Sequence, residues 1–473
     1  MDAKSNQRVY IRDLSQHKNQ IVNIQGWINT RRDQGKMIFF DFRDITGIVQ
    51  GVVLPKSECL EIAKTTKEEF VVEIQGKVNP RPERNIKEGV LNGDIELEIL
   101  EITILNQSRT LPFPIEGDTK EINELIRLKH RYLDLRSQRM RKNIINRSKV
   151  QKFIRDYLIK KDFIEIETPL LSAPTPEGSR SFVVPSRIYR DNFYSLPQSP
   201  QQYKQLLMVA GFEKYFQLAR CMRDEDTRGD RQPEFTQLDM EMSFATEEEI
   251  MQLNEKLLIE IVNNLYPEKK IQQIPFPRMT YKEAMDKYGN DRPDIRDDKS
   301  DDNLLAFLWV TDFNMFEKPE QDNPDEVTEW TFTHNPFSKP RDEHFDDFMN
   351  KKNIDKILTT QYDITLNGFE IGGGSIRNHS AEALKKTFEI MGYSEEKIQS
   401  NFGHILDALE LGAPPHGGIA WGFDRLMMIL ENEPNIREVI PFAKTGDGKD
   451  LMMNAPANIS IKQKIELGIK IEK

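Results

Sequence analysis

Charged side chains are concentrated in residues 221–241, and their types and spacing indicate a binding site. Three arginines and seven carboxylates surround a turn-prone Arg-Gly-Asp-Arg loop between two segments that read as strands. Because strand side chains alternate between faces, Arg223 and Glu225 are predicted to share one face. The polar residues predicted to share a face of the second strand are Gln237, Asp239 and Glu241. A sheet face with both signs of charge is costly to bury unless a ligand satisfies it, so we predict a site for a phosphorylated ligand.

Three other segments place polar groups beside glycine or proline. Residues 196–204 carry Ser199, Gln201 and Lys204. Residues 363–377 carry Asp363, Glu370, a triple glycine and Arg377. Residues 414–425 form a glycine-rich turn that leads into a predicted helix at 424–431. Taken singly, each has an ordinary alternative: a bulge, a surface lysine, two solvated acids, or a local ion pair. Their common setting in otherwise apolar sequence favours a shared site.

Bulk properties exclude several classes of protein. The 473 residues allow two or three domains, and no apolar run of about 18 residues or signal-peptide pattern occurs, so we expect a cytoplasmic protein without a membrane span. Cys59 and Cys221 lie far apart without metal-ligand spacing, which indicates free thiols. The chain has neither a P-loop nor a GxGxxG motif.

The elements that must position these groups fall into two dissimilar halves. Residues up to about 107 predict a small β-barrel, with strands at 21–28, 37–42, 47–54, 70–78 and 95–105 and a helix at 58–67 after the third strand. This is the pattern of the oligonucleotide-binding (OB) barrel, although an SH3-like barrel would give nearly the same trace. Arg31, Arg32 and Phe39 suit the stacking of unpaired bases, and the alternative is that Phe39 belongs to the core.

A basic segment joins the halves. Residues 127–149 hold nine basic residues and one acid, which indicates either a solvated helix face or a phosphate-backbone contact, even though the net charge is −11. Periodicity predicts a helix at 149–160 and then a strand that Pro169 ends. From there to about residue 460, strands and helices mix without regular βαβ alternation, which predicts an α+β fold.

These motifs resemble the three signature motifs of class II aminoacyl-tRNA synthetases, most closely the bacterial type of aspartyl-tRNA synthetase. Residues 163–169 resemble the first motif, 223–239 the second and 422–425 the third. The resemblance implies an OB-fold anticodon-binding domain at 1–107, a hinge at 108–140, and a catalytic domain at 141–473 built on an antiparallel sheet flanked by helices. It also implies a homodimer that uses the first motif.

The resemblance implies roles for individual positions. Arg223 and Arg425 would be catalytic, and Asp363 and Glu370 would hold Mg²⁺. The positions implied for ATP are Arg223, Asp224, Glu225, Arg231, Gln232, Phe235, Gln237, Glu370, Gly422, Phe423, Asp424 and Arg425. Those implied for L-aspartate are Glu177, Ser199, Gln201, Lys204, Asp239, His334 and Arg377. Lys204 and Arg377 would face the substrate carboxylate and reject asparagine, whose amide has only one acceptor oxygen.

The positions implied for tRNA are Arg32, Gln34, Phe39, Gln50, Arg84 and Asn85. Gln34 and Arg84 fit no pattern that separates an enzyme specific for tRNA(Asp) from one that also charges tRNA(Asn), so both alternatives stand. A synthetase-like regulator or small-molecule ligase is a third reading, which the retained barrel and site residues disfavour. The chain also departs from the family: only residues 297–306, an acidic stretch, stand where the family carries an inserted domain.

Overall fold

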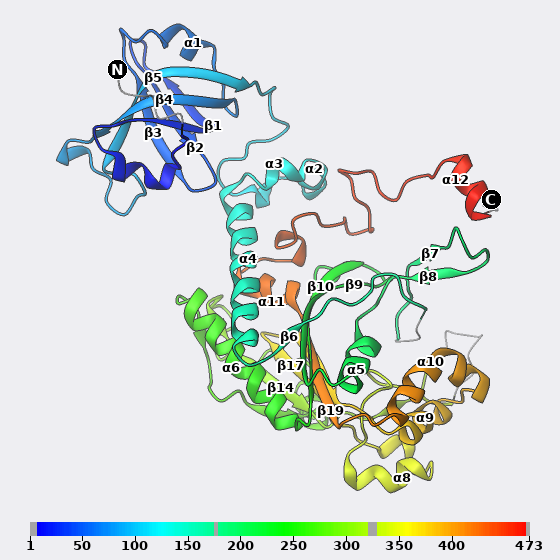
Figure 1. The fold of residues 1–473 in the computed structure, drawn as a ribbon. Coiled ribbons are helices and arrows are strands. Elements are labelled where there is room, and N and C mark those ends of the chain that lie inside the picture. Colours follow the sequence, from blue (N-terminus) through cyan, green and yellow to red (C-terminus); the bar gives the residue numbers. More distant parts are fainter. Residues whose placement is uncertain (1–6, 175–177, 320–328, 470–473) are drawn as a thin grey trace. The chain divides into compact units, whose positions relative to one another are not determined.

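The computed structural model describes residues 7–174, 178–319 and 329–469, and the chain forms two compact units that divide after Pro114 (Figure 1). We describe each unit by itself. Among the described residues, no helix is both long and apolar enough to cross a membrane.

The first unit is a closed five-stranded barrel with strand order β1-β2-β3-β5-β4. Its strands are β1 (Ile21–Asp33), β2 (Ile38–Arg43), β3 (Ile48–Val53), β4 (Val71–Pro80) and β5 (Ile95–Asn106), and α1 (Leu60–Thr65) follows the third. Alternate strand residues such as Ile24, Phe40 and Val72 fill the interior. The predicted barrel, with its helix after the third strand, is confirmed.

Phe39 lies on the outer surface of this barrel. Its neighbour Phe40 is completely buried, whereas Phe39 is only half-buried and pairs across the strands with Arg32 and Val52. The alternative that Phe39 belongs to the core is therefore wrong, because strand alternation assigns the core to Phe40.

The second unit is built on an eight-stranded sheet of order β12-β14-β17-β18-β19-β10-β9-β6. These strands are β12 (Arg278–Thr280), β14 (Phe307–Thr311), β17 (Gln361–Leu366), β18 (Phe369–Ile376), β19 (His416–Gly422), β10 (Glu234–Ser243), β9 (Lys214–Met222) and β6 (Ile164–Glu165). All neighbours are antiparallel except the two edge pairs, β12 with β14 and β6 with β9. The predicted α+β class is confirmed, and the sheet is antiparallel with parallel pairing at both edges.

Helices cover the apolar face of this sheet (Figure 1). Leu238 and Met240 of β10 belong to one core with α4 (Gln138–Ile159), α6 (Glu247–Leu265) and α11 (Phe423–Leu430). The alternate residues of β10 therefore face the other side, as predicted. Helix α4 begins eleven residues before the predicted start, and the predicted strand up to Pro169 shrinks to the two residues of β6.

The remaining elements surround this frame. A second core lies among α8 (Phe345–Met349), α9 (Ala381–Ile390) and α10 (Glu395–Glu410). The others are α2 (Glu124–Lys129), α3 (Arg131–Asp134), β7 (Val183–Pro185), β8 (Phe193–Ser195), α5 (Gln201–Val209), β11 (Lys270–Ile271), α7 (Tyr281–Tyr288), β13 (Leu304–Leu305), β15 (Phe316–Glu317), β16 (Thr331–Phe332) and α12 (Ile461–Leu467). Residues 297–303, in the acidic stretch between α7 and β13, form an exposed loop.

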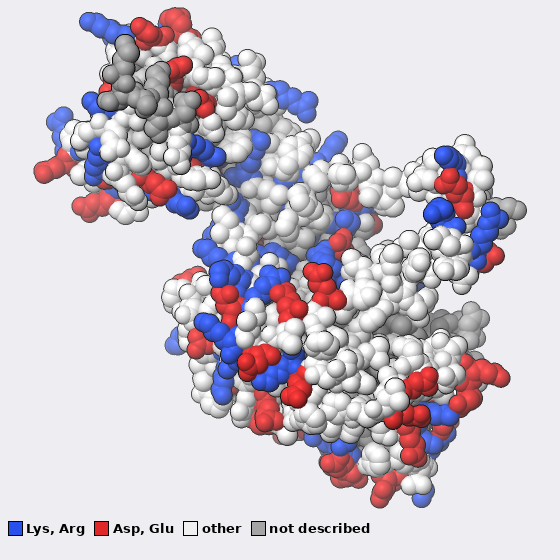
Figure 2. Space-filling model, viewed as in Figure 1, with Lys and Arg blue, Asp and Glu red and all other residues white. Residues whose placement is uncertain are grey.

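The basic segment at 127–149 is largely an internal ion-pair network. Arg127 forms two hydrogen bonds with Glu438, each 2.9 Å long, and Arg139 lies 3.0 Å from both Glu433 and Glu438. Arg147 donates to Asp424 at 2.5 Å. A phosphate-backbone contact through these arginines is therefore wrong, because carboxylates from residues 424–438 already hold them. Figure 2 shows basic and acidic side chains interspersed on the visible face.

Candidate active site

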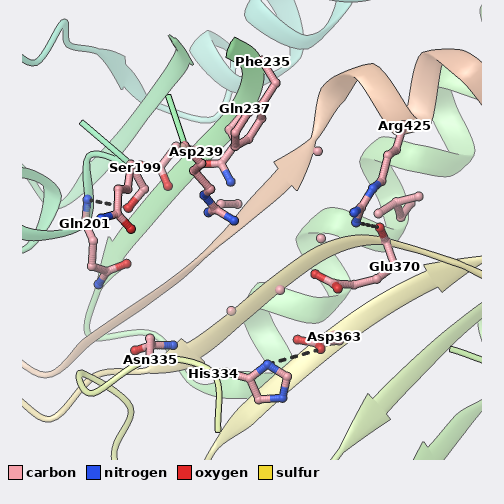
Figure 3. Close-up of a pocket in the computed structure, with 18 of the residues that line it drawn as sticks. Ser199, Gln201, Phe235, Gln237, Asp239, His334, Asn335, Asp363, Glu370 and Arg425 are labelled. Atoms are coloured by element: carbon pink, nitrogen blue, oxygen red, sulfur yellow. Dashed lines mark hydrogen bonds and ion pairs between the residues drawn. The ribbon is translucent and has the colours of Figure 1, made fainter. Parts of the chain in front are cut away.

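The polar face of the sheet opens into a cavity of about 510 Å³. Strands β10, β17, β18 and β19 form its floor, and side chains from α5 and α11 line its ends. In Figure 3, Ser199, Gln201 and Asp239 lie toward one end and Arg425 and Glu370 toward the other. The four segments singled out in the sequence therefore meet at one site.

One end of the cavity holds four buried charges. Lys204 Nζ lies 2.7 Å from Asp239 Oδ1 and 3.3 Å from Glu241 Oε2, and Arg377 donates to both oxygens of Glu241 at 2.9 and 3.1 Å. All four side chains are at most 2% exposed. Two cations and two anions balance one another, which is how such charges can be buried at all.

The two carboxylates of this cluster differ in their titration. Burial alone would raise the pKa of Glu241, but Arg377 and Lys204 outweigh it and lower that pKa. Burial dominates at Asp239 and raises its pKa, although Lys204 acts in the opposite direction. Asp239 Oδ2 has no hydrogen-bond partner among residues 7–174, 178–319 and 329–469, so this oxygen can accept from a cationic group of a ligand.

The other end of the cavity presents arginines on a more open surface. The Arg223 guanidinium lies 5.2 Å from the centre of the Phe235 ring, and its buried Nε has no hydrogen-bond partner in the part of the chain that the structure describes. Arg425 donates to the Glu370 carbonyl at 2.8 Å, and Arg231 lies 3.9 Å from Glu225. Guanidinium groups beside an aromatic ring suit a ligand with phosphates and a planar base.

A pair of carboxylates lies between these ends. Asp363 is buried, accepts a hydrogen bond from Gln361 Nε2 at 2.7 Å and lies 4.0 Å from His334 Nδ1. Burial and the nearby Glu370 charge raise the pKa of Asp363 well above its usual range, whereas burial lowers the pKa of His334. A divalent cation would relieve this repulsion. Within the described part of the chain, no group of three or more His, Cys, Asp or Glu side chains could hold a metal ion.

The triple glycine of β18 allows the sheet to approach the ligand space closely. A Cβ on Gly373 would lie 2.6 Å from Asp363 Oδ1, and one on Gly374 would lie 2.1 Å from the Gly418 carbonyl oxygen. Neither backbone nor a buried carboxylate can yield by so much, so these positions exclude every other residue. The glycines keep the Asp363 carboxylate accessible.

Most of the predicted site residues line the cavity. Those that do are Ser199, Gln201, Lys204, Arg223, Glu225, Arg231, Gln232, Phe235, Gln237, Asp239, His334, Asp363, Glu370, Arg377, Gly422, Asp424 and Arg425. Asp224 is exposed and not among the lining residues, and Phe423 is buried in the core under α11. Glu177 lies outside the described residues. The strand pattern predicted for Arg223 and Glu225 is wrong, because β9 ends at Met222.

Sequence reasoning assigned no role to several residues at the site. Glu241 does not line the cavity but holds Arg377, and its place on the Gln237–Asp239 face was the signal that could have identified it. Asn335 and Gln361 line the cavity: Asn335 directly follows His334, and Gln361 lies two residues before Asp363 on β17, which is the signal that could have found them.

The candidate tRNA residues of the first unit lie on strands β1, β2 and β3 of the barrel and in two loops. Arg32 pairs with Asp41 at 2.8 Å, and Gln50 accepts from Arg81 at 3.0 Å and donates to Glu96 at 2.9 Å. Gln34 is exposed in the turn after β1, and Arg84 and Asn85 are exposed in a short helical turn after β4. This surface combines basic, amide and aromatic groups.

Comparisons with known proteins identify both units. Residues 123–446 match the family of class II tRNA synthetases (D, K and N), and residues 22–105 match the OB-fold nucleic acid binding domain. The aspartate–tRNA ligase of Listeria welshimeri is 38% identical over 601 aligned residues, covering all of this chain and 99% of the relative. The aspartate–tRNA(Asp/Asn) ligase of Thermoanaerobacter sp. is 37% identical, covering 95% of this chain and 96% of the relative.

Solved structures share the architecture. Asparaginyl-tRNA synthetase from Pyrococcus horikoshii, complexed with asparaginyl-adenylate, superimposes with a TM-score of 0.74 at 22% identity and covers 93% of this chain and 98% of its own. Aspartyl-tRNA synthetase from Entamoeba histolytica gives 0.70 at 23% identity, covering 93% and 92%. These structures show the fold alone. The family match and the full-length relatives establish more: the chain belongs to the class II tRNA synthetases of the D, K and N group.

Proposed function

We propose that this protein activates L-aspartate with ATP and attaches it to tRNA(Asp). The observation that carries the proposal is the buried cluster of Lys204 and Arg377 with Asp239 at one end of the cavity. Two cations suit the side-chain carboxylate of aspartate, and the partner-free oxygen of Asp239 suits its ammonium group. Asparagine would put an N–H₂ donor against buried cations, which is costly. Many curated relatives are named aspartate–tRNA ligases.

The first step requires positioning more than proton transfer. The α-carboxylate of aspartate is already ionised, so it attacks the α-phosphorus of ATP, forms aspartyl-adenylate and releases pyrophosphate. Arg223 lines the cavity beside Phe235, where it can neutralise the charge that both reactants bring together. Arg231 and Arg425 bind the outer phosphates, and Phe235 packs under the adenine.

Asp363 and Glu370 are the residues that would hold Mg²⁺, which supplies positive charge to the phosphate oxygens. Burial and the Glu370 charge raise the pKa of Asp363, so a cation at this place would stabilise its ionised form. Their carboxylate oxygens match the ligand preference of this ion.

In the second step, a terminal ribose hydroxyl of the tRNA attacks the adenylate carbonyl and releases AMP. We propose that the barrel reads the anticodon through Phe39, Gln50 and Arg32, with Gln34, Arg84 and Asn85 at its edge. The OB-fold match, the half-buried Phe39 and Gln50 on the outer surface, and the exposed Arg32 support this role. Because its partner is tRNA, we also place the protein in the cytoplasm.

Two observations bear on the rest of the family pattern. The alignment with the Listeria relative spans 601 positions, whereas this chain has 473 residues, which supports the loss of an inserted domain at 297–306.

Exposed Ile164, Leu170 and Leu171 lie at and after the edge strand β6, which supports a homodimer through this edge. Light scattering on purified protein would measure the mass, and a monomer at micromolar concentration would contradict the dimer.

The central test is pyrophosphate exchange with aspartate or asparagine as the only amino acid. We expect exchange with aspartate and at least a thousandfold lower kcat/KM with asparagine, because the amide N–H₂ group of asparagine would face the buried cations. Charging of tRNA(Asp) and tRNA(Asn) transcripts then separates a strict enzyme from one that accepts both, as a relative named for Asp/Asn does. Absence of aspartate-dependent exchange would refute the proposed function.

A further inference from the structure

A chain of three buried or partly buried hydrogen bonds leads from strand β19 to the aspartate end of the cavity. His416 Nδ1 lies 2.8 Å from the carbonyl oxygen of Pro414, and His416 Nε2 lies 3.2 Å from Gln205 Nε2. Gln205 Oε1 in turn lies 3.1 Å from Gln201 Nε2. His416 and Gln205 are both fully buried, whereas Gln201 reaches the cavity.

The first link fixes the proton on the imidazole. A carbonyl oxygen can only accept a hydrogen bond, so His416 Nδ1 must carry the hydrogen. Burial lowers the pKa of His416, which keeps the ring neutral at ordinary pH. In a neutral ring with hydrogen on Nδ1, Nε2 is an acceptor.

The remaining links then have one consistent orientation. Gln205 must present its NH₂ group to His416 Nε2, which turns its oxygen toward Gln201. That oxygen accepts from Gln201 Nε2, so the amide oxygen of Gln201 is the end left for the cavity. Figure 3 shows the Gln201 side chain extending from the start of α5 along the cavity wall.

We propose that His416 and Gln205 are positioning residues that hold the amide of Gln201 with its oxygen toward the ammonium group of the amino-acid substrate. The inference rests on the proposed function and adds the residues that set the polarity of this subsite. Asp239 Oδ2 and the Gln201 oxygen then both act as acceptors there. Without the relay, the Gln201 amide could rotate and present its NH₂ group, which repels an ammonium.

The chain offers a matched control on the same helix. Gln202 is also a buried glutamine of α5, and its oxygen also contacts a histidine, His404 Nε2, at 2.5 Å. Gln202 does not line the cavity. Replacing either glutamine by methionine removes a similar buried amide, but only Gln205→Met interrupts the relay.

The test measures pyrophosphate exchange by the full-length protein, with succinate as a competitive inhibitor. Succinate keeps both carboxylates of aspartate but lacks the ammonium group. We expect Gln205→Met to raise KM for aspartate about tenfold, the equivalent of one charge-assisted hydrogen bond, and to change kcat and KM for ATP by less than about twofold. The inhibition constant of succinate should not change, and Gln202→Met should leave KM for aspartate at the wild-type value.

Other outcomes overturn the proposal. An unchanged KM for aspartate in Gln205→Met, or an equal loss of aspartate and succinate binding, would show that Gln205 does not act through the ammonium subsite. Should that variant not fold, Gln205→Asn keeps a buried amide but withdraws it by one carbon, and the same split between aspartate and succinate is required. Wild-type protein without aspartate-dependent exchange would instead refute the proposed function and leave the relay's geometry as described.

Discussion

Two groups of arginines look alike in the sequence and differ in the fold. Arg127 and Arg147 are buried, Arg139 is partly buried, and all three are paired with carboxylates of residues 424–438. Arg223 and Arg231 line the cavity, where Arg223 Nε has no partner among the described residues and the ion pair of Arg231 spans 3.9 Å. A charged side chain that is paired within the fold stabilises it, whereas a charged side chain with few such partners is available to bind a ligand.

The largest effect should come from the cavity group. We expect Arg223→Ala to lower kcat for aspartate-dependent pyrophosphate exchange about a thousandfold, because it removes charge stabilisation at the reacting phosphate. The free energy of unfolding should change by less than about 1 kcal/mol, since this guanidinium holds no partner within the fold tightly. Near-normal exchange in this variant would show that Arg223 takes no part in the reaction, and the difference between the two groups of arginines would not hold.

The paired group should behave in the opposite way. We expect Glu438→Ala to lower the free energy of unfolding by about 3–5 kcal/mol, because it leaves the buried Arg127 without its principal partner. Urea titration followed by circular dichroism measures the loss. Protein that remains folded should keep its KM for ATP, and a strong rise in that KM would place the network in the active site instead.

Acid should weaken the same network. Burial alone would raise the pKa of Glu438, but hydrogen bonds and charges from Arg127, Arg139 and Arg131 outweigh it and lower the pKa to about 2. A lowered folded-state pKa stabilises the fold above the ordinary value of 4.5, and this contribution is lost as pH falls from there toward about 2. Unfolding free energies measured between pH 6 and pH 3 should therefore fall less in Glu438→Gln than in wild type, and equal slopes would contradict the assignment.

An exposed arginine of the barrel gives the smallest effect and sharpens the comparison. Arg32 is paired with Asp41, but its side chain is 47% exposed. Arg32→Ala should therefore change unfolding by less than about 0.5 kcal/mol. We expect it to raise KM for tRNA(Asp) severalfold while pyrophosphate exchange stays unchanged, which aminoacylation and exchange assays on one preparation can separate. A large loss of stability would group Arg32 with the buried network.

Prediction from sequence succeeded where local chemistry determines structure. The alternation of Leu238 and Met240 with Asp239 correctly assigned the two faces of β10, and the turn residues located all five barrel strands. The resemblance also brought to one cavity residues that lie far apart in the chain, such as Lys204 and Arg377.

Prediction failed where the outcome depends on distant partners. The basic segment read as a linker, and nothing near it indicated that Glu433 and Glu438, about three hundred residues later, pair with its arginines. Glu241 was recognised as a polar strand residue, but its partner Arg377 lies 136 positions away, so its role in the site was not visible. Long-range pairing of charges carries no periodic signal in one sequence.

The glycines of β18 have a genetic consequence. Any single-base change that alters a glycine codon adds at least a β-carbon or ends the chain, and at Gly373 and Gly374 that carbon would collide with Asp363 or with the backbone of β19. A population that depends on this gene should therefore retain almost no missense alleles at these codons. The exposed loop at 297–303 should accumulate them freely. The same chain thus combines codons closed to variation with a stretch open to it.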